Sequence, residues 1–129
     1  KIGVMICWDQ WYASSYTTLT KNGADLIICP TSIGWAYFNN KMIGLKNEKK
    51  KWEMVIRSNS LMNNVPVIVA NRTGIEKAFN HKINFWGSSF VTNSHGDIIA
   101  QAKNKNQYLK IALNLKEKCV AEKYWNFIK

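Results

Sequence analysis

The stretch that decides the fold is Ile2-Gly3-Val4-Met5-Ile6-Cys7-Trp8-Asp9-Gln10, at residues 2–10. Residues 2–6 are an apolar run rich in branched side chains, which predicts a fully buried strand. Polar Asp9 and Gln10 follow at once, so Cys7 comes where the strand ends. A helix is predicted over residues 10–22, with Asn22-Gly23 as its stop signal, and a second buried strand over residues 26–30. This opening is therefore a strand-helix-strand unit of the parallel type.

The rest of the chain continues this alternation and then becomes mainly strand. Residues 31–47 contain glycines, an Asn39-Asn40 pair and several aromatic side chains, and they predict an irregular loop beside a pocket. Apolar residues at helical spacing predict a helix over residues 48–64. Strands are predicted over residues 65–71, 85–91, 98–100 and 108–113, with a hairpin turn over residues 93–97. The order predicts a layered α/β fold with a mixed sheet.

Composition bounds the class of protein. A chain of 129 residues has room for one domain or part of one, and 47% hydrophobic residues predict a globular protein. The formal charge of +10 comes from lysines dispersed along the chain, with one tight cluster at Lys49-Lys50-Lys51, so we predict no nucleic-acid partner. No apolar run approaches the length of a membrane span, so no membrane partner is predicted either.

The three cysteines, Cys7, Cys29 and Cys119, are widely separated and form no Cys-x-x-Cys pair. This spacing predicts neither a disulfide framework nor a metal site, and it fits the reducing cytoplasm. The chain starts in strand rhythm without a methionine, so we expect it to be cut from a longer protein.

Cys7 is the candidate nucleophile because of its position. At the end of a buried strand and before a helix, a thiol faces the crevice where open α/β sheets bind ligands, beside free backbone N–H groups. Cys29 ends the neighbouring strand, but Pro30 removes a donor there. Cys119 lies in a charged terminal stretch. The residues alone leave open that Cys7 is an inert core thiol.

The stretch from Gly3 to Trp11, with Cys-Trp-Asp-Gln-Trp at its end, resembles the cysteine signature of carbon-nitrogen hydrolases of the nitrilase superfamily, in the form seen in N-carbamoylputrescine amidases. Further blocks of that branch follow in family order at residues 23–27, 30–34, 64–74 and 85–90. The resemblance implies a four-layer αββα sandwich. Residues 1–129 would be the C-terminal part of one such domain, present as a partial domain that forms homo-oligomers in the full-length protein and needs no metal or cofactor.

The same resemblance implies a cysteine hydrolase of carbamoyl amines. Cys7 would attack the carbamoyl carbon, and the backbone N–H of Trp8 would help a lysine to bind the oxyanion. That lysine and the two family glutamates precede the region covered here. Glu48 and Glu53 look like a solvated helix face and Glu76 like a loop charge, so none of them is expected to be the base.

Several residues are expected near the substrate with less specificity. Thr31, Ser32 and Trp35 follow the second strand and are predicted to line the amine pocket, where Trp35 would stack on an ammonium group. Asn71 and Arg72 match the family's Asn-Arg pair and border that pocket. Ordinary packing is the alternative for all five residues.

Other positions are expected to be structural. Asp9 is predicted to cap the helix that follows, and His81 and His95 are predicted to be surface residues in a loop and a turn. Ala13-Ser14 replaces the family's usual Pro-Glu, which puts local packing in doubt. Residues 124–127 resemble a terminal aromatic segment whose expected charged continuation is missing.

The predicted function is cleavage of N-carbamoylputrescine to putrescine, carbon dioxide and ammonia in polyamine biosynthesis, with this chain inactive by itself. Two alternatives stay open. One is another amidase of the superfamily that acts on a different carbamoyl or linear amide substrate. The other is a non-catalytic half-domain that pairs with another chain, because half a sandwich exposes an apolar face.

Overall fold

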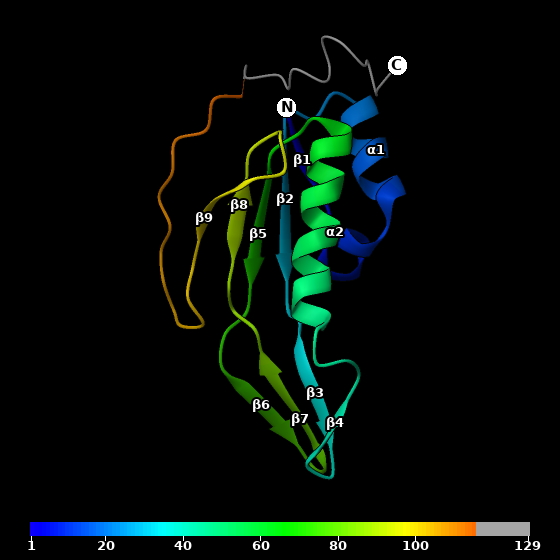
Figure 1. Ribbon diagram of the computed structural model, residues 1–129, viewed down its shortest axis with the longest axis vertical. Coiled ribbons are helices and arrows are strands. Elements are labelled where there is room, and N and C mark those ends of the chain that lie inside the picture. The colour runs from blue at the N-terminus through cyan, green and yellow to red at the C-terminus, as the bar shows by residue number, and fades with distance from the viewer. Residues whose placement is uncertain (116–129) are drawn as a thin grey trace.

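The structure, a computed structural model, describes residues 1–115, and it contains two sheets and two α-helices (Figure 1). In chain order the elements are β1 (Ile2–Val4), η1 (Cys7–Trp11), α1 (Ala13–Lys21), β2 (Leu26–Thr31), β3 (Gly34–Phe38), β4 (Lys41–Ile43), α2 (Glu48–Asn63), β5 (Val67–Asn71), β6 (Ile75–Ala78), β7 (His81–Phe85), β8 (Phe90–Thr92) and β9 (Ile98–Gln101). The predicted mixed α/β class is confirmed. Residues 116–129, which include Cys119 and the terminal aromatic segment, lie outside the described part.

The larger sheet has the strand order β1-β2-β5-β8-β9. β1, β2 and β5 run parallel, with Ile27 opposite Val67, while β8 and β9 are antiparallel to their neighbours. The mixed sheet and the parallel strand-helix-strand order were therefore predicted correctly. The prediction that the first strand is fully buried is wrong, because β1 is an edge strand on which Ile2 and Val4 are 61% and 57% exposed. The carboxyl ends of β2 and β5 point toward the second sheet, which forms the other end of the molecule (Figure 1).

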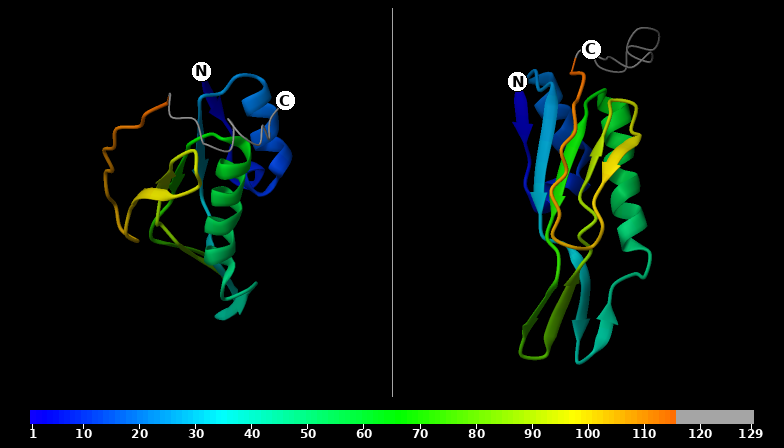
Figure 2. Two further views of the ribbon diagram at one scale, coloured as in Figure 1. Left: turned by 45° about the horizontal axis from the view of Figure 1, so that its top comes forward. Right: turned by 90° about the vertical axis from the view of Figure 1, so that its left-hand side faces the viewer.

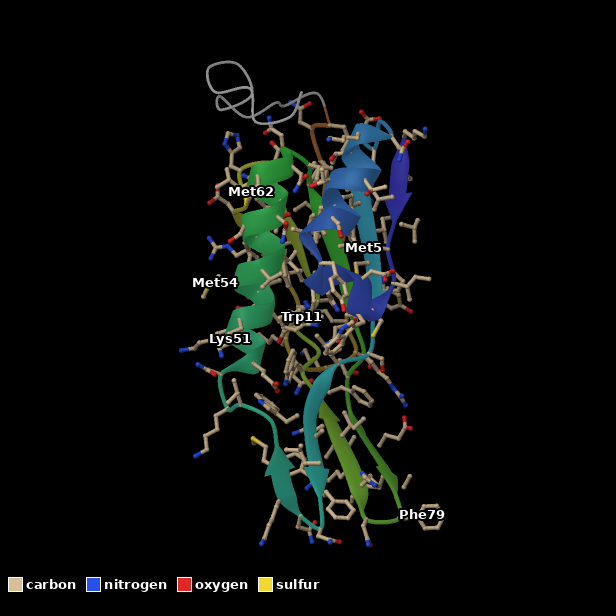
Figure 3. The ribbon with its side chains drawn as sticks, turned by 90° about the vertical axis from the view of Figure 1, so that its right-hand side faces the viewer. Met5, Trp11, Lys51, Met54, Met62 and Phe79 are labelled. Atoms are coloured by element: carbon tan, nitrogen blue, oxygen red, sulfur yellow. The ribbon has the colours of Figure 1, made fainter. Side chains whose placement is uncertain are left out.

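Both helices cover the same face of the larger sheet (Figures 1 and 2). Inward-facing residues of β2 and β5 alternate along each strand, and they pack against Trp52 and Ile56 of α2 in one buried cluster. Lys51 and Met54 lie on the outward side of α2 (Figure 3). The helix ends as predicted at an Asn pair, where Asn64 adopts a left-handed conformation with φ of 55°.

The first helix differs from the prediction over residues 10–22. The chain forms the short 3₁₀ helix η1 and then α1, separated by Tyr12 in an extended conformation with φ of −100° and ψ of 119°. Helical periodicity cannot detect this break, because Trp11 before it and Tyr16 and Leu19 after it pack against the same buried cluster. Ala13, at the departure from the family pattern, starts α1 without a side-chain cap.

The second sheet corrects the prediction of an irregular loop over residues 31–47. Its order is β4-β3-β7-β6, and all of its pairs are antiparallel. Asn39 and Asn40 both have positive φ, 47° and 60°, which is the two-residue hairpin turn whose twist matches that of the strands. The Asn pair was thus a hairpin signal between β3 and β4.

The predicted strand over residues 85–91 is wrong for a related reason. β7 ends at Phe85 in the second sheet, and β8 begins at Phe90 in the first. Gly87 and Ser88, both with positive φ, turn the chain between the two sheets. Phe85-Trp86 and Phe90-Val91, on either side of Gly87-Ser88-Ser89, are all buried, which is why the stretch resembles a single strand.

Two further differences concern the edges of the sheets. β6 and β7 form a hairpin with Phe79 projecting into solvent at its tip (Figure 3), so His81 and Glu76 lie in strands and not in loops. Residues 108–113 form no strand, because within the described part of the chain no strand pairs with them, and Tyr108 is fully exposed. The turn over residues 93–97 is confirmed, with the Asn93 amide N–H bonded to Asp97 O.

Candidate active site

Cys7 begins η1 directly after the extended chain that continues β1. Its φ of 49° is left-handed, a conformation that non-glycine residues rarely adopt and that concentrates at functional sites. The side chain is half-buried, so it keeps access to solvent. A thiol held at a strained strand-to-helix turn has the placement that nucleophilic catalysis requires.

Asp9 holds this turn in place. The Ile6 N–H donates to its carboxylate at 2.9 Å, and the Asp9 N–H donates back to Ile6 O at 3.1 Å. Asp9 therefore accepts a local N–H bond as predicted, but it caps η1, in which it lies, and not the following helix α1, which has no side-chain cap. The Asp9 N–H makes the first hydrogen bond within η1, so the N–H groups of Cys7 and Trp8, which come before it, have no acceptor within that helix. Trp8 is thus available as the predicted oxyanion donor, an assignment that stays a prediction.

Cys29 contrasts sharply with Cys7. It is fully buried, and its Sγ lies 3.8 Å from Oε1 of Gln10. Burial raises the pKa of the Cys29 thiol to about 12, with a further rise from the neighbouring Cys7 and Asp9 charges, while a hydrogen bond from the Cys7 backbone opposes the rise. The thiol of Cys29 is therefore protonated and inaccessible.

Gln10 is a buried polar residue that sequence reasoning missed. Its Nε2 donates to the Thr31 hydroxyl at 2.9 Å, and its Oε1 accepts from Trp52 Nε1 at 2.7 Å. The Tyr16 hydroxyl donates to its backbone oxygen at 2.9 Å. Gln10 thus ties η1 to β2, α1 and α2. Its place inside the cysteine signature was the available signal.

A pocket of about 350 Å³ opens beside η1, and we call it the tryptophan pocket. It is lined by Trp8, Trp11, Ser32, Ile33, Gly34, Ala36, Ile43, Gly44, Glu48, Ile83 and Trp86. The indole N–H groups of Trp11 and Trp86 are buried and have no partner among the described residues. Figure 3 shows Trp11 between η1 and α2. The pocket therefore has mainly apolar walls and one carboxylate, that of Glu48.

The predicted substrate residues divide between locations. Ser32 lines the tryptophan pocket. Trp35 does not line it, but its ring packs edge-to-face against that of the lining residue Trp86, with 6.0 Å between the ring centres. Thr31 is buried and accepts the Gln10 amide, as described above. Asn71 and Arg72 line a separate pocket.

The Asn-Arg pair has clear structural contacts. Asn71 accepts from the Ile33 N–H at 3.0 Å and donates to the carbonyl oxygens of Ile33 and Gly87. It therefore links the two segments in which the chain passes from one sheet to the other, at Ile33 and at Gly87. Arg72 pairs with Glu76 and lies 4.5 Å from the centre of the Phe85 ring. Their substrate-binding role stays a prediction.

Three pocket residues were missed as site candidates: Trp11, Glu48 and Trp86. Glu48 is half-buried at the start of α2, against the expectation of a solvated face. Glu53 is also half-buried, and its carboxylate accepts from Gln101 at 3.0 Å. Glu48 and Trp86 lie far from Trp11 in the sequence, so only the tertiary structure brings them beside η1.

Within residues 1–115 no group of three or more His, Cys, Asp and Glu side chains is arranged to hold a metal ion. Neither of the two described helices has the length and apolar character needed to cross a membrane.

Comparison with known proteins places this geometry in a family. The sequence profile of the family described as carbon-nitrogen hydrolase matches residues 1–117. The chain is 33% identical over 102 residues to the citrullinase of Francisella tularensis, covering 79% of this chain and 34% of that protein. It is 31% identical over 116 residues to the N-carbamoylputrescine amidase of Arabidopsis thaliana, covering 87% of this chain and 38% of that protein.

The fold agrees with the sequence comparison. A carbon-nitrogen hydrolase from Helicobacter pylori G27 superposes with a TM-score of 0.85 at 30% identity, covering 98% of this chain and 44% of that one. The chain therefore belongs to the carbon-nitrogen hydrolase family of the nitrilase superfamily, and it has part of that fold. It spans 34% and 38% of the length of the two curated relatives.

Proposed function

We propose that this chain carries the nucleophile of an amidohydrolase that cleaves N-carbamoylputrescine, with Cys7 as the attacking residue. The observation that carries the proposal is the strained, half-buried Cys7, whose neighbour in the chain, Trp8, lines the tryptophan pocket. The similarity to plant N-carbamoylputrescine amidases at about 31% identity supports the choice of substrate. In this proposal the chain is the C-terminal part of a single domain, and the full-length protein is an oligomer in the cytoplasm, acting in polyamine biosynthesis.

The reaction has two halves. The Cys7 thiolate adds to the carbamoyl carbon, the C–N bond to the terminal amide nitrogen breaks, and that nitrogen leaves as ammonia after gaining a proton. Water then cleaves the resulting S-carbamoyl bond and restores the thiol. The product carbamate decomposes to carbon dioxide and putrescine. The Trp8 N–H would stabilise the oxyanion of each tetrahedral intermediate.

The general base and the oxyanion lysine are proposed to come from a region outside this chain. Glu48 and Glu53 belong to α2, and Glu76 pairs with Arg72 in the second sheet. The chain alone is therefore proposed to be inactive.

A second candidate is citrulline hydrolysis, favoured by the similarity to a citrullinase at 33% identity. Both substrates end in the same carbamoyl group, so Cys7 would act identically on each. A non-catalytic half-domain is the remaining alternative, and the exposed apolar face of the larger sheet favours it.

The test measures ammonia release with both substrates by the full-length protein and by the 129-residue chain, each beside its Cys7→Ala variant. We expect Cys7-dependent release of ammonia and putrescine from the full-length protein alone. Activity that survives Cys7→Ala would refute the nucleophile, and no turnover of either substrate would favour the half-domain.

A further inference from the structure

The tryptophan pocket has a chemical character that the two candidate substrates match differently. Three indole rings, those of Trp8, Trp11 and Trp86, form its walls, and the Trp8 and Trp11 ring centres are 6.0 Å apart. Such walls suit methylene groups, and an ammonium group gains a further attraction to an aromatic face. Trp8 directly follows Cys7 in the chain, so one wall of the pocket is formed by the residue next to the proposed nucleophile.

Glu48 gives the pocket its charge. It is the one charged residue among those that line it within the described part of the chain. Its carboxylate lies against Gly44, since a methyl group placed on Gly44 would be only 2.9 Å from Oε2. No described side chain forms a hydrogen bond or ion pair with this carboxylate, although it is half-buried. A half-buried carboxylate of this kind is available for a cationic ligand.

Two residues that line the pocket, Trp11 and Trp86, have indole N–H groups without a partner among the described residues. Trp86 is 97% buried, since only 3% of it is exposed, and neither its Nε1 nor that of Trp11 has a partner among the described residues. Buried donors are nearly always satisfied in native proteins. Both nitrogen atoms are themselves buried, however, so Glu48 is the polar group that the pocket presents to a ligand.

We propose that Glu48 is the specificity-determining residue, which binds the ammonium group at the far end of a carbamoylated amine while the tryptophan rings enclose its alkyl chain. This inference rests on the proposed function and adds the contact that selects the substrate. A zwitterionic substrate fits less well, because its carboxylate would meet Glu48 with no lysine or arginine in the described lining to offset it. The chain thus prefers carbamoyl amines to carbamoyl amino acids.

The experiment uses the full-length protein and three substrates: N-carbamoylputrescine, citrulline, and N-pentylurea, in which a methyl group replaces the ammonium. The variant is Glu48→Gln, which keeps the side-chain size and removes the charge. Its control is Glu53→Gln, on the same helix but bonded to Gln101 outside the pocket.

We expect Glu48→Gln to lower kcat/KM for N-carbamoylputrescine by about 10-fold or more, chiefly by raising KM. The same variant should change kcat/KM for N-pentylurea by less than about 2-fold. The preference for N-carbamoylputrescine over citrulline should shrink correspondingly. Glu53→Gln should leave all three values unchanged.

The outcomes separate the two proposals. The role of Glu48 would be overturned if Glu48→Gln lowered kcat/KM equally for N-carbamoylputrescine and N-pentylurea, or left the preference for N-carbamoylputrescine over citrulline unchanged. The hydrolase assignment would stand in either case. Absence of Cys7-dependent turnover with every urea would overturn the proposed function, and this inference with it. Because N-pentylurea reports on the fold of each variant, a misfolded protein is recognised by its loss of that activity.

Discussion

Cys7 and Cys29 lie near the ends of adjacent strands, yet they differ in access to solvent. Cys7 is half-exposed at a strained turn, whereas Cys29 is enclosed by the core. Burial is the main reason why the pKa of Cys29 rises to about 12, so its thiolate fraction at pH 8 is far below that of an ordinary thiol.

This contrast predicts selective alkylation. Iodoacetamide at pH 8 should modify Cys7 at least about 10-fold faster than Cys29, as followed by mass spectrometry of the digested protein. Raising the pH toward 11 should accelerate labelling of Cys29, because more of a thiol with a raised pKa ionises as the pH approaches it. Equal rates in the folded protein would contradict the assignment, and denatured protein is the control in which both should react alike.

Gln10 determines the local geometry beneath the nucleophile. It is fully buried, and its side-chain amide bonds to Thr31 and Trp52. Removing it leaves both partners without their hydrogen bonds and opens a cavity, so Gln10→Ala should lower the free energy of unfolding by about 2–4 kcal/mol.

Urea denaturation measures this loss. The matched control is Gln101→Ala, whose side chain makes one exposed hydrogen bond, to Glu53, and which should cost less than about 0.5 kcal/mol. A Gln10 variant as stable as the Gln101 variant would show that this network contributes little.

At the scale of elements, the close pairing of β3 and β7 joins the tryptophan pocket to the rest of the fold. Gly34 lies opposite Phe85, and a methyl group at Gly34 would come within 2.2 Å of the Asn84 carbonyl oxygen. That contact is with backbone, which cannot rotate away as a flexible side chain does.

Gly34→Ala is therefore expected to destabilise the protein by about 3 kcal/mol or more. Gly74→Ala provides the comparison, because Gly74 has φ of 91° and no atom near the new methyl group, so backbone strain alone costs about 1–2 kcal/mol. Thermal melting followed by circular dichroism compares the two variants. A smaller loss at Gly34 than at Gly74 would mean that β3 and β7 separate easily.

At the scale of the whole molecule, the larger sheet is covered by helices on one face only (Figure 2). On β1 and its extension, Ile2, Val4 and Ile6 alternate along the opposite side and are 61%, 57% and 63% exposed. β1 is also an edge strand, with unpaired backbone groups available to another chain. Such a surface favours association.

We therefore expect the 129-residue chain by itself to associate. Size-exclusion chromatography with light scattering should give masses that rise above the monomer with concentration, and Val4→Thr with Ile6→Thr should shift them downward. Met54→Thr and Met62→Thr, on the exposed side of α2, are the control pair and should have little effect. A chain that stays monomeric at all concentrations would argue against the partial-domain interpretation.

Local pattern was sufficient for the order of strand, helix and strand at the start of the chain, though not for the break at Tyr12, and for the long helix α2. Each depends on residues close together in the chain, where periodicity and turn chemistry act directly. The cysteine signature also identified the family correctly, because its blocks are contiguous.

Tertiary structure decided the rest. The Asn39-Asn40 pair and the turn at Gly87 can be interpreted only once β3, β7 and β8 have paired with their neighbours. Likewise, nothing local in residues 85–91 shows that Phe85 and Phe90 belong to two different sheets. The pocket depends on the same pairings, which bring Glu48 and Trp86 to Trp8. Burial and strand pairing are non-local, so no window of sequence contains them.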